Sequence, residues 1–250
     1  MKNYTLFLIC WIALAVFTCL YLLKFKTAPY GKFSNNRWGA MISNKWGWFI
    51  MEFTVMVAFL IQIPLRSFNW LSPKGVMAAL FLLHYIYRSI IYPFMIRTKG
   101  KKMPVAIMLS AILFNAINGS VLGIWFARYA NYAASWLYSL PFIVGIILFF
   151  TGMIIHQNSD YYLIHLRKKE ETDYKLPVKG LFKYVTSPNL LGEITEWMGY
   201  ALLTWSLPAL AFFMWTCANL LPRAVANQKW YKEKFRPYPE NRKILFPFVW

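Results

Sequence analysis

Seven apolar runs, each close to the length that crosses a lipid bilayer, constrain this chain more than any other feature. The runs lie near residues 4–23, 46–65, 74–96, 104–127, 133–155, 188–204 and 206–225. Hydrophobic residues make up 59% of the 250 residues and charged residues only 14%, whereas soluble domains are about 25% charged. A soluble fold could not cover so much apolar surface. The pattern predicts an all-α integral membrane protein in which residues 1–250 form a single domain of seven transmembrane helices.

Two local signals sharpen the helix boundaries. Residues 205–208, Trp-Ser-Leu-Pro, predict a tight turn between the last two runs, because proline favours the first turn of a helix. Ser187 followed by Pro188 has the pattern of an N-cap and a first helical position. The first run is predicted to be a retained helix rather than a signal peptide, because no small-residue cleavage site follows it.

The basic residues predict how the helices are oriented. If seven spans alternate, 22 of the 27 Lys and Arg residues fall on one side and four on the other, with Arg88 inside a span. Lysine and arginine collect in cytosolic loops, so the N-terminus is expected outside and the C-terminus in the cytosol. Topology and anionic lipid then account for much of the basic excess behind the net charge of +18. We expect a multi-pass protein of a bacterial inner membrane or the endoplasmic reticulum, in contact with membrane lipid, with no nucleic acid and no obligate protein partner.

Several polar side chains are predicted to lie at membrane depth, where they are costly and usually face a partner or a cavity. Glu52 lies in the second run, and His84, Tyr85 and Arg88 lie in the third, with His84 and Arg88 on one helical face. Interhelical polar clamps would explain many such residues. A lone Glu52, however, would tend to be protonated, and an acid beside the Tyr85 phenol makes a hydrogen-bond donor pair suited to polarising a ketone.

A second polar group is expected on the cytosolic side. Asp160 and Arg167 are two helical turns apart, and Glu193 and Glu196 share one face of a largely apolar helix. The C-terminal segment adds the side chains of Arg223, Asn227, Tyr231 and Arg242. Arginines bind phosphate, while acids and amides bind ribose hydroxyls or a carboxamide. The set therefore predicts a site for a phosphorylated, hydroxyl-rich cofactor.

Missing motifs narrow the chemistry. The sequence contains no GxGxxG or Walker A motif, no HExxH and no GxSxG. Three scattered histidines and three cysteines without CxxC spacing indicate neither a metal site nor a disulfide framework. The tryptophans near the span ends, Trp46 and Trp48 among them, are explained by an interfacial aromatic belt.

These residues resemble the steroid 5α-reductase (3-oxo-5α-steroid 4-dehydrogenase) family. The segments that carry the resemblance are Tyr30-Gly31-Lys32, Glu52, His84-Tyr85-x-x-Arg88, Asn118-Gly119, Ser159-Asp160-Tyr161, Leu166-Arg167-Lys168, Gly180-Leu181-Phe182, Asn189-x-Leu191-Gly192-Glu193-Ile194-x-Glu196-Trp197, Thr204-Trp205-Ser206-Leu207-Pro208 and Tyr238-Pro239-x-x-Arg242-Lys243. The resemblance covers nearly the whole chain, and its motifs are most specific in the C-terminal third.

The resemblance implies seven membrane helices that enclose NADPH and a lipid-substrate cavity, with the cofactor site facing the cytosol. It implies hydride transfer to C5 of a 3-oxo-Δ4 steroid, with Tyr85 donating to the ketone oxygen and Glu52 supporting that donation. The positions expected around the cofactor are Asp160, Arg167, Asn189, Glu193, Arg223, Asn227, Tyr231 and Arg242. Arg88, Asn118 and Glu196 also match the family pattern, without an assigned role.

The sequence departs from the vertebrate pattern of that family in three places. His156 and Asn158 replace an Asn and a His, and Asn227 falls where a His is usual. The loop of residues 99–104 also carries different basic residues. These departures bear on individual cofactor contacts rather than on the class of reaction.

Two other functions fit the sequence less well. One is an S-adenosylmethionine-dependent membrane methyltransferase of the isoprenylcysteine carboxyl type, which needs no phosphate clamp. The other is a non-enzymatic lipid-binding or scaffold protein whose buried polar side chains only clamp helices. The basic C-terminal segment and the Glu52/Tyr85 pair argue against the methyltransferase, whereas a complete lack of nucleotide affinity would favour the non-enzymatic protein.

Overall fold

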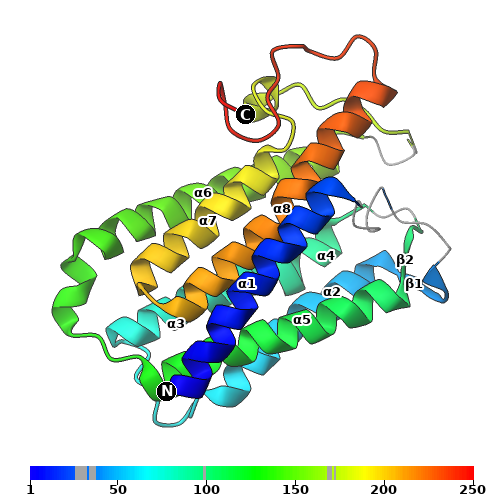
Figure 1. The fold of residues 1–250 in the computed structure, drawn as a ribbon. Helices are drawn as coiled ribbons and strands as arrows, with labels where there is room; N and C mark the ends of the chain where they lie inside the picture. The colour runs from blue at the N-terminus through cyan, green and yellow to red at the C-terminus, as the bar shows by residue number, and fades with distance from the viewer. Residues whose placement is uncertain (26–32, 34–37, 98–99, 168–170, 172) are drawn as a thin grey trace. The chain divides into compact units, whose positions relative to one another are not determined.

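The described residues of this computed structural model are 1–25, 33, 38–97, 100–167, 171 and 173–250, and they form seven helical rods that overlap the seven predicted runs (Figure 1). The rods are α1 (Lys2–Lys24), α2 (Asn44–Gln62), α3 (Pro73–Tyr85) continued by η3 (Ile86–Ile91) and α4 (Tyr92–Met95), α5 (Val105–Ile124) with η4 (Trp125–Tyr129), α6 (Leu140–His165), α7 (Pro188–Thr204) and α8 (Leu207–Lys234). Among the described residues, every rod except α2 and α7 is long and apolar enough to cross a membrane. The fold is therefore mostly helical and fits a multi-pass membrane protein, while seven spans and their orientation stay predictions.

The fifth and seventh runs are shifted or extended relative to the prediction. Residues 134–138 form a 3-10 turn, η5 (Ala134–Tyr138), and α6 begins only at Leu140, where Ser139 Oγ accepts a hydrogen bond from the Phe142 amide at 3.4 Å. The helix then continues ten residues past the predicted end at residue 155. As a result, His156 and Asp160 lie inside a helix rather than after one. Similarly, α8 extends to Lys234 rather than ending at residue 225.

The predicted turn between the last two helices is confirmed. Trp205 ends α7 in the left-handed conformation (φ 45°, ψ 44°), and Ser206 Oγ accepts a hydrogen bond from the Ala209 amide at 3.4 Å. Ser187 occupies the predicted N-cap position of α7 but makes no side-chain cap bond. Its hydroxyl accepts from Asn227 Nδ2 at 3.1 Å instead, which ties the start of α7 to α8.

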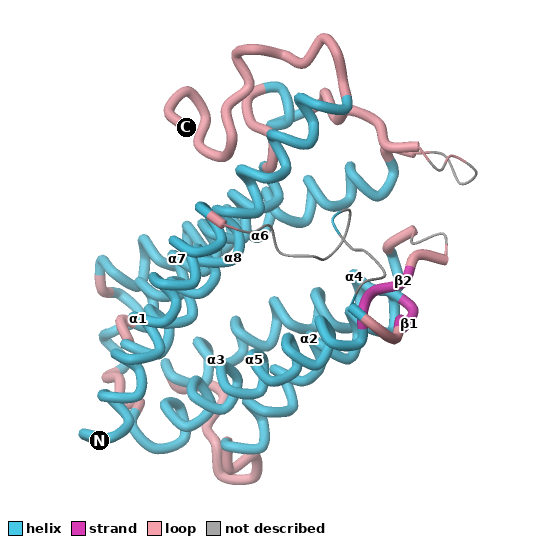
Figure 2. The backbone as a smooth tube through the Cα atoms, turned by 45° about the vertical axis from the view of Figure 1, so that its right-hand side comes forward, coloured by secondary structure: helices cyan, strands magenta, loops and turns pink. Residues whose placement is uncertain are grey.

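The described elements divide into two compact units. One comprises Met1–Ala28 and Val144–Trp250, and the other comprises Pro29–Ile143. Buried clusters lie within each unit: Ile194, Ala224 and Leu245 in the first, and Met51, Met103 and Met108 in the second. Figure 2 traces both units as a tube. The expectation of a single domain stays a prediction.

Helices α6 and α7 approach until their backbones touch, and glycines permit this contact. Gly145 and Gly152 on α6 face Gly199 and Gly192 on α7, so the two helices run antiparallel. A Cβ at Gly145 would lie 2.5 Å from the Leu203 nitrogen, and one at Gly152 would lie 2.5 Å from the Gly192 oxygen. Small residues at such crossings are typical of membrane helix pairs.

Within the other unit, α5 packs along α2 through Asn115, Gly119 and Gly123, which recur every four residues on one face of α5. Asn115 Nδ2 donates to the Met51 carbonyl at 2.7 Å, and Gly119 and Gly123 meet the α2 backbone one and two turns further on. The contacted residues of α2, namely Met51, Val55 and Phe59, follow in the same order along the chain, so the two helices are parallel. Strands β1 (Met41–Ser43) and β2 (Lys102–Pro104) pair antiparallel immediately before the two helices, which aligns the helix starts. Asn115 therefore links α5 to α2, as an interhelical polar clamp does.

Candidate active site

Glu52 and Arg88 form an ion pair within the unit of residues 29–143. Arg88 Nη2 lies 3.7 Å from Glu52 Oε1, and the two side chains are only 10% and 14% exposed. Glu52 comes from the middle of α2 and Arg88 from η3. The prediction of a protonated Glu52 assumed a carboxyl group without a partner. That assumption is wrong, because Glu52 is paired with Arg88. At such burial the partner offsets the cost of removing each charge from water.

Tyr85 and Arg88 lie where the helical rod changes from an α-helix to a π-helix. The rod that begins as α3 widens into a π-helix at Ile86–Ile91, so Tyr92 N bonds to Tyr87 O, five residues back. Such π-turns are frequent at functional sites. Because the turn widens here, the predicted shared face of His84 and Arg88 no longer follows from α-helical spacing. Tyr85 is 4% exposed at the junction, and its carbonyl accepts a hydrogen bond from Ser89 Oγ.

Aromatic rings flank the Arg88 guanidinium, an arrangement that was not predicted from the sequence. The guanidinium carbon lies 5.1 Å from the Trp48 ring centroid and 4.9 Å from that of Tyr92. Cation–π contacts of this kind hold an arginine in one orientation. Trp48 had been assigned to the interfacial belt. An interfacial belt still explains the exposed Trp46. Trp48 lies one helical turn before Glu52 on α2, and this i,i+4 spacing could have indicated that Trp48 lies beside the ion pair.

In the other unit, three carboxyl groups converge on His156. Its Nε2 atom lies 3.2 Å from Asp160 Oδ2 and 3.8 Å from Glu193 Oε2, while Nδ1 lies 3.5 Å from Glu196 Oε2. His156 is 2% exposed and Glu196 is completely buried. The glycine contact between α6 and α7 makes this possible, because a Cβ at Gly192 would collide with the His156 backbone.

In the sequence, His156 is a departure from the family pattern to which no role was assigned. The structure makes it the residue that joins Asp160 on its own helix to Glu193 and Glu196 on α7. Asp160 is further held by Asn189, whose Nδ2 atom donates to Asp160 Oδ1 at 3.0 Å. Four predicted positions, Asp160, Asn189, Glu193 and Glu196, are therefore brought together around one histidine.

Arg242 is buried with unused hydrogen-bond donors. It is 3% exposed, and neither its Nε nor its Nη1 atom has a hydrogen-bond partner among the described residues. Its guanidinium carbon lies 5.3 Å from the Tyr238 ring centroid, and Gln228 Nε2 donates to its carbonyl at 3.0 Å. Buried donors without partners are rare in proteins, so these N–H groups indicate a place for an anionic ligand.

The chain around Arg242 is held by bonds to the segment before α7. The Lys243 amide donates to the Tyr184 carbonyl at 2.9 Å, and the Thr186 amide donates to the Lys243 carbonyl at 2.9 Å. Thr186 Oγ1 also bonds the Tyr238 hydroxyl at 2.7 Å. Neither Thr186 nor Gln228 was singled out from the sequence, because their partners are separated from them by many residues.

The remaining predicted cofactor residues lie on the same unit. Arg223, Asn227 and Tyr231 recur every four residues and so share one face of α8. The Arg167 guanidinium lies 5.0 Å from the Tyr174 ring centroid, and that ring packs against Trp230 at 4.9 Å. Asn118, in contrast, lies on α5 and donates to the Phe114 carbonyl of its own helix at 2.8 Å. The motif residues Tyr30-Gly31-Lys32, Lys99 and Lys168 lie outside the described residues.

Comparison with known proteins identifies the family. A family model described as 3-oxo-5-alpha-steroid 4-dehydrogenase matches residues 101–250. The chain belongs to this family. The steroid 5-alpha-reductase DET2 of Solanum lycopersicum is 40% identical over 254 residues, covering 100% of this chain and 98% of that protein. The 3-oxo-5-alpha-steroid 4-dehydrogenase 1 of Bos taurus is 38% identical over 237 residues, covering 92% and 91%. Its namesake in Homo sapiens is 43% identical over 178 residues, covering 71% and 68%.

Both groups of candidate site residues fall within these similarities. The family match of residues 101–250 contains His156, its carboxylate partners and Arg242. Glu52, Tyr85 and Arg88 precede that stretch, but the full-length similarity to the Solanum protein includes them. The resemblance stated from the motifs is thereby confirmed. Neither the family match nor these relatives support the methyltransferase alternative.

Proposed function

We propose that this protein catalyses the NADPH-dependent reduction of the C4–C5 double bond of a 3-oxo-Δ4 steroid, producing the 5α-3-oxosteroid. The observation that carries the proposal is the full-length similarity to proteins named steroid 5-alpha-reductase, which covers the buried Glu52–Arg88 pair. Apolar helices around these residues suit a flat, rigid lipid substrate that arrives from the bilayer.

On the substrate side, Tyr85 donates a hydrogen bond to the ketone oxygen at C3. The reaction builds negative charge on that oxygen as the enone becomes enolate-like, so a donor aimed at it stabilises the transition state more than the ground state. Glu52 supports the donation by Tyr85. Arg88 holds Glu52 in place, and its positive charge offsets the carboxylate and the charge developing on the substrate.

On the cofactor side, the described residues fit NADPH. Arg242 offers two buried N–H donors for phosphate, and Arg167 offers a second guanidinium. Asp160, Glu193 and Asn189 offer carboxylate and amide groups for ribose hydroxyls or the carboxamide. When bound, NADPH would supply the hydride that adds to C5, and a proton from solvent would add to C4 to complete the saturated ketone. The basic residues of the C-terminal segment are expected on the cytosolic side, where this cofactor is available.

The experiment is a turnover assay of the purified protein in detergent. NADPH deuterated at the transferable position is supplied with a panel of 3-oxo-Δ4 steroids, and the products are analysed by mass spectrometry and NMR. We expect the label at C5 of a saturated 3-ketone. A label at C3 would indicate ketone reduction instead, and turnover with S-adenosylmethionine but not NADPH would overturn the proposal.

A further inference from the structure

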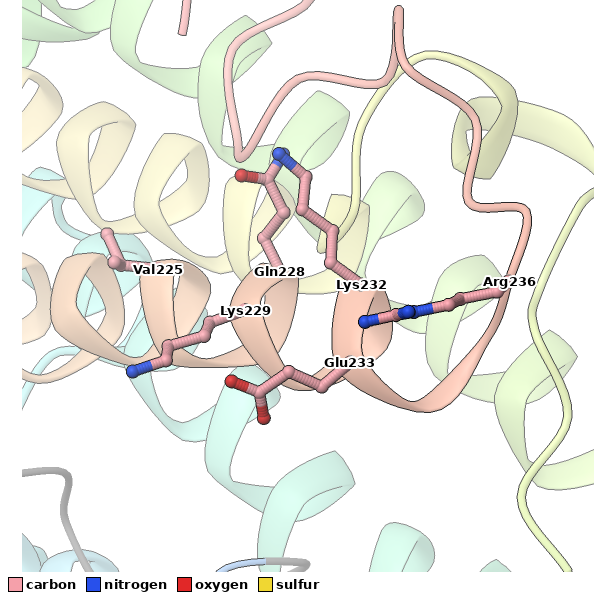
Figure 3. A pocket seen from close by; sticks show the side chains of 6 residues that line it. All are labelled: Val225, Gln228, Lys229, Lys232, Glu233 and Arg236. Atoms are coloured by element: carbon pink, nitrogen blue, oxygen red, sulfur yellow. The ribbon is translucent and has the colours of Figure 1, made fainter.

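A basic pocket lies at the C-terminal end of α8, outside the residues assigned to the reaction. Its volume is about 420 Å³, and it is lined by Val225, Gln228, Lys229, Lys232, Glu233 and Arg236 (Figure 3). Three cations and one acid give it a net positive charge. Lys229, Lys232 and Arg236 are exposed, and none of them forms an ion pair with another described residue. Glu233 is the one acid among the described lining residues and forms no ion pair with these cations, so the pocket keeps a net positive charge.

The pocket and the proposed cofactor residues occupy different faces of α8. Arg223, Asn227 and Tyr231 follow one face, whereas Val225, Lys229 and Lys232 follow another. At 3.6 residues per turn, the mean directions of the two sets differ by roughly 180°. No residue is shared between them. Gln228 also donates to the Arg242 carbonyl at 3.0 Å, so the pocket adjoins the proposed cofactor site through that residue, while Lys229 and Lys232 lie on the opposite face of α8.

Helix α1 indicates how deep in the membrane the pocket lies. The two helices lie side by side and run in the same direction, and the Trp11 and Trp215 ring centroids are 4.8 Å apart (Figure 1). Helix α1 ends at Lys24, a fixed number of residues after Trp11. The residue equally far after Trp215 on α8 is Gln228, so Gln228 lies level with the end of α1. The last turns of α8, which carry Lys229 and Lys232, therefore extend beyond the end of α1.

The end of α1 marks the edge of the hydrocarbon layer. The helix has 23 residues, and apolar side chains such as Leu6, Phe17 and Leu23 are exposed along it. A helix of this size spans about 34 Å, close to the roughly 30 Å of a hydrocarbon core. Side chains just beyond its end lie at the level of lipid headgroups.

We propose that this pocket binds the headgroup of an anionic phospholipid. The cations meet the lipid phosphate and its negative headgroup, while Val225 lines the pocket one helical turn before Lys229. Basic clusters next to the end of a membrane helix attract anionic lipid, at about 1 kcal/mol for each Lys or Arg near the surface. The headgroup depth favours a lipid over a free anion.

The test is native mass spectrometry of the purified full chain in a neutral detergent, with equal amounts of dioleoylphosphatidylglycerol and dioleoylphosphatidylcholine added. We expect the wild type to retain phosphatidylglycerol in preference. Lys229→Gln/Lys232→Gln should weaken phosphatidylglycerol binding about tenfold or more. The matched control, Lys179→Gln/Lys183→Gln, removes the same charge from exposed positions outside the pocket and should bind as the wild type does.

Two further arms keep the proposal falsifiable. Glu233→Gln removes the one acid among the described residues that line the pocket and should strengthen phosphatidylglycerol binding, an effect that a damaged fold would not produce. Millimolar inorganic phosphate should not displace the lipid. Equal retention of the two lipids, an equal loss in the control variant, or full displacement by phosphate would each overturn the proposal, the last by assigning the pocket to free anions.

Discussion

His156 Nδ1 lies 3.5 Å from Glu196 Oε2, across the place where α6 and α7 touch through facing glycines. The Nε2 atom of the same ring lies 3.2 Å from Asp160. One imidazole thus links carboxyl groups of two helices at a depth where isolated charges are costly. The helix contact and the proposed cofactor site depend on the same residue.

Replacing His156 with alanine should destabilise the protein and weaken NADPH binding together. The change leaves buried carboxyl groups of Asp160 and Glu196 without the imidazole, at a cost on the order of 3 kcal/mol. Thermal unfolding in detergent and the KM for NADPH measure the two effects. His156→Asn restores an amide donor and should recover part of both. Wild-type stability in the alanine variant would show that the cluster is not held by His156.

Gly192→Ala should separate α6 from α7. Its Cβ would collide with the His156 backbone and lie 2.7 Å from the Gly152 oxygen, so the helices must move apart. Overpacking of this kind costs about 1–3 kcal/mol. We expect a lower melting temperature and a raised KM for NADPH. Ile154→Ala, at an exposed position of α6, is the control and should change neither quantity appreciably.

Arg88→Met should lower the melting temperature more than the double change Glu52→Gln/Arg88→Met, which removes both charges of the pair. The single change leaves Glu52 buried without its cation, whereas Glu52→Gln/Arg88→Met leaves no charge to compensate. Breaking a buried ion pair typically costs about 3–5 kcal/mol, and neutral replacement costs less. Thermal unfolding of the two single variants and the double variant measures the coupling. Strictly additive effects would argue against a working pair.

Tyr85→Phe should lower kcat by about 10²–10³ while NADPH still binds, because the change removes one donor to the ketone oxygen. Steady-state kinetics with a 3-oxo-Δ4 steroid and fluorescence titration with NADPH separate the two effects. Tyr87→Phe, two residues further along the same helical rod, is the matched control and should retain most activity. Near wild-type turnover of the Tyr85 variant would remove the phenol from the reaction.

Arg242→Ala should raise the KM for NADPH by about tenfold or more, since a charge-assisted hydrogen bond contributes about 1.5–3 kcal/mol. The structural basis is the pair of unused donors on a buried guanidinium. Arg242→Lys keeps the charge but not the planar donor set, so it should recover only part of the affinity. An unchanged KM in Arg242→Ala would exclude this arginine from the cofactor site.

The sequence alone determined the helical rods, because an apolar run of bilayer length leaves the backbone no alternative to internal hydrogen bonding. It also determined the α7–α8 turn, since Ser206 and Pro208 act on their immediate neighbours. The family followed from motifs that are local in the chain. The boundaries of α6 were missed because aromatic and apolar residues before Leu140 continue the hydropathy of the helix without being part of it.

Only the tertiary structure decided how these side chains are paired. Glu52 and Arg88 come from different helices, and a π-turn that no spacing rule anticipates sets the position of Arg88. His156 meets Glu196 because four glycines bring two backbones together, and Arg242 is buried because the last residues bond to the segment before α7. Such contacts join residues distant in the chain, so they depend on packing rather than on any local pattern.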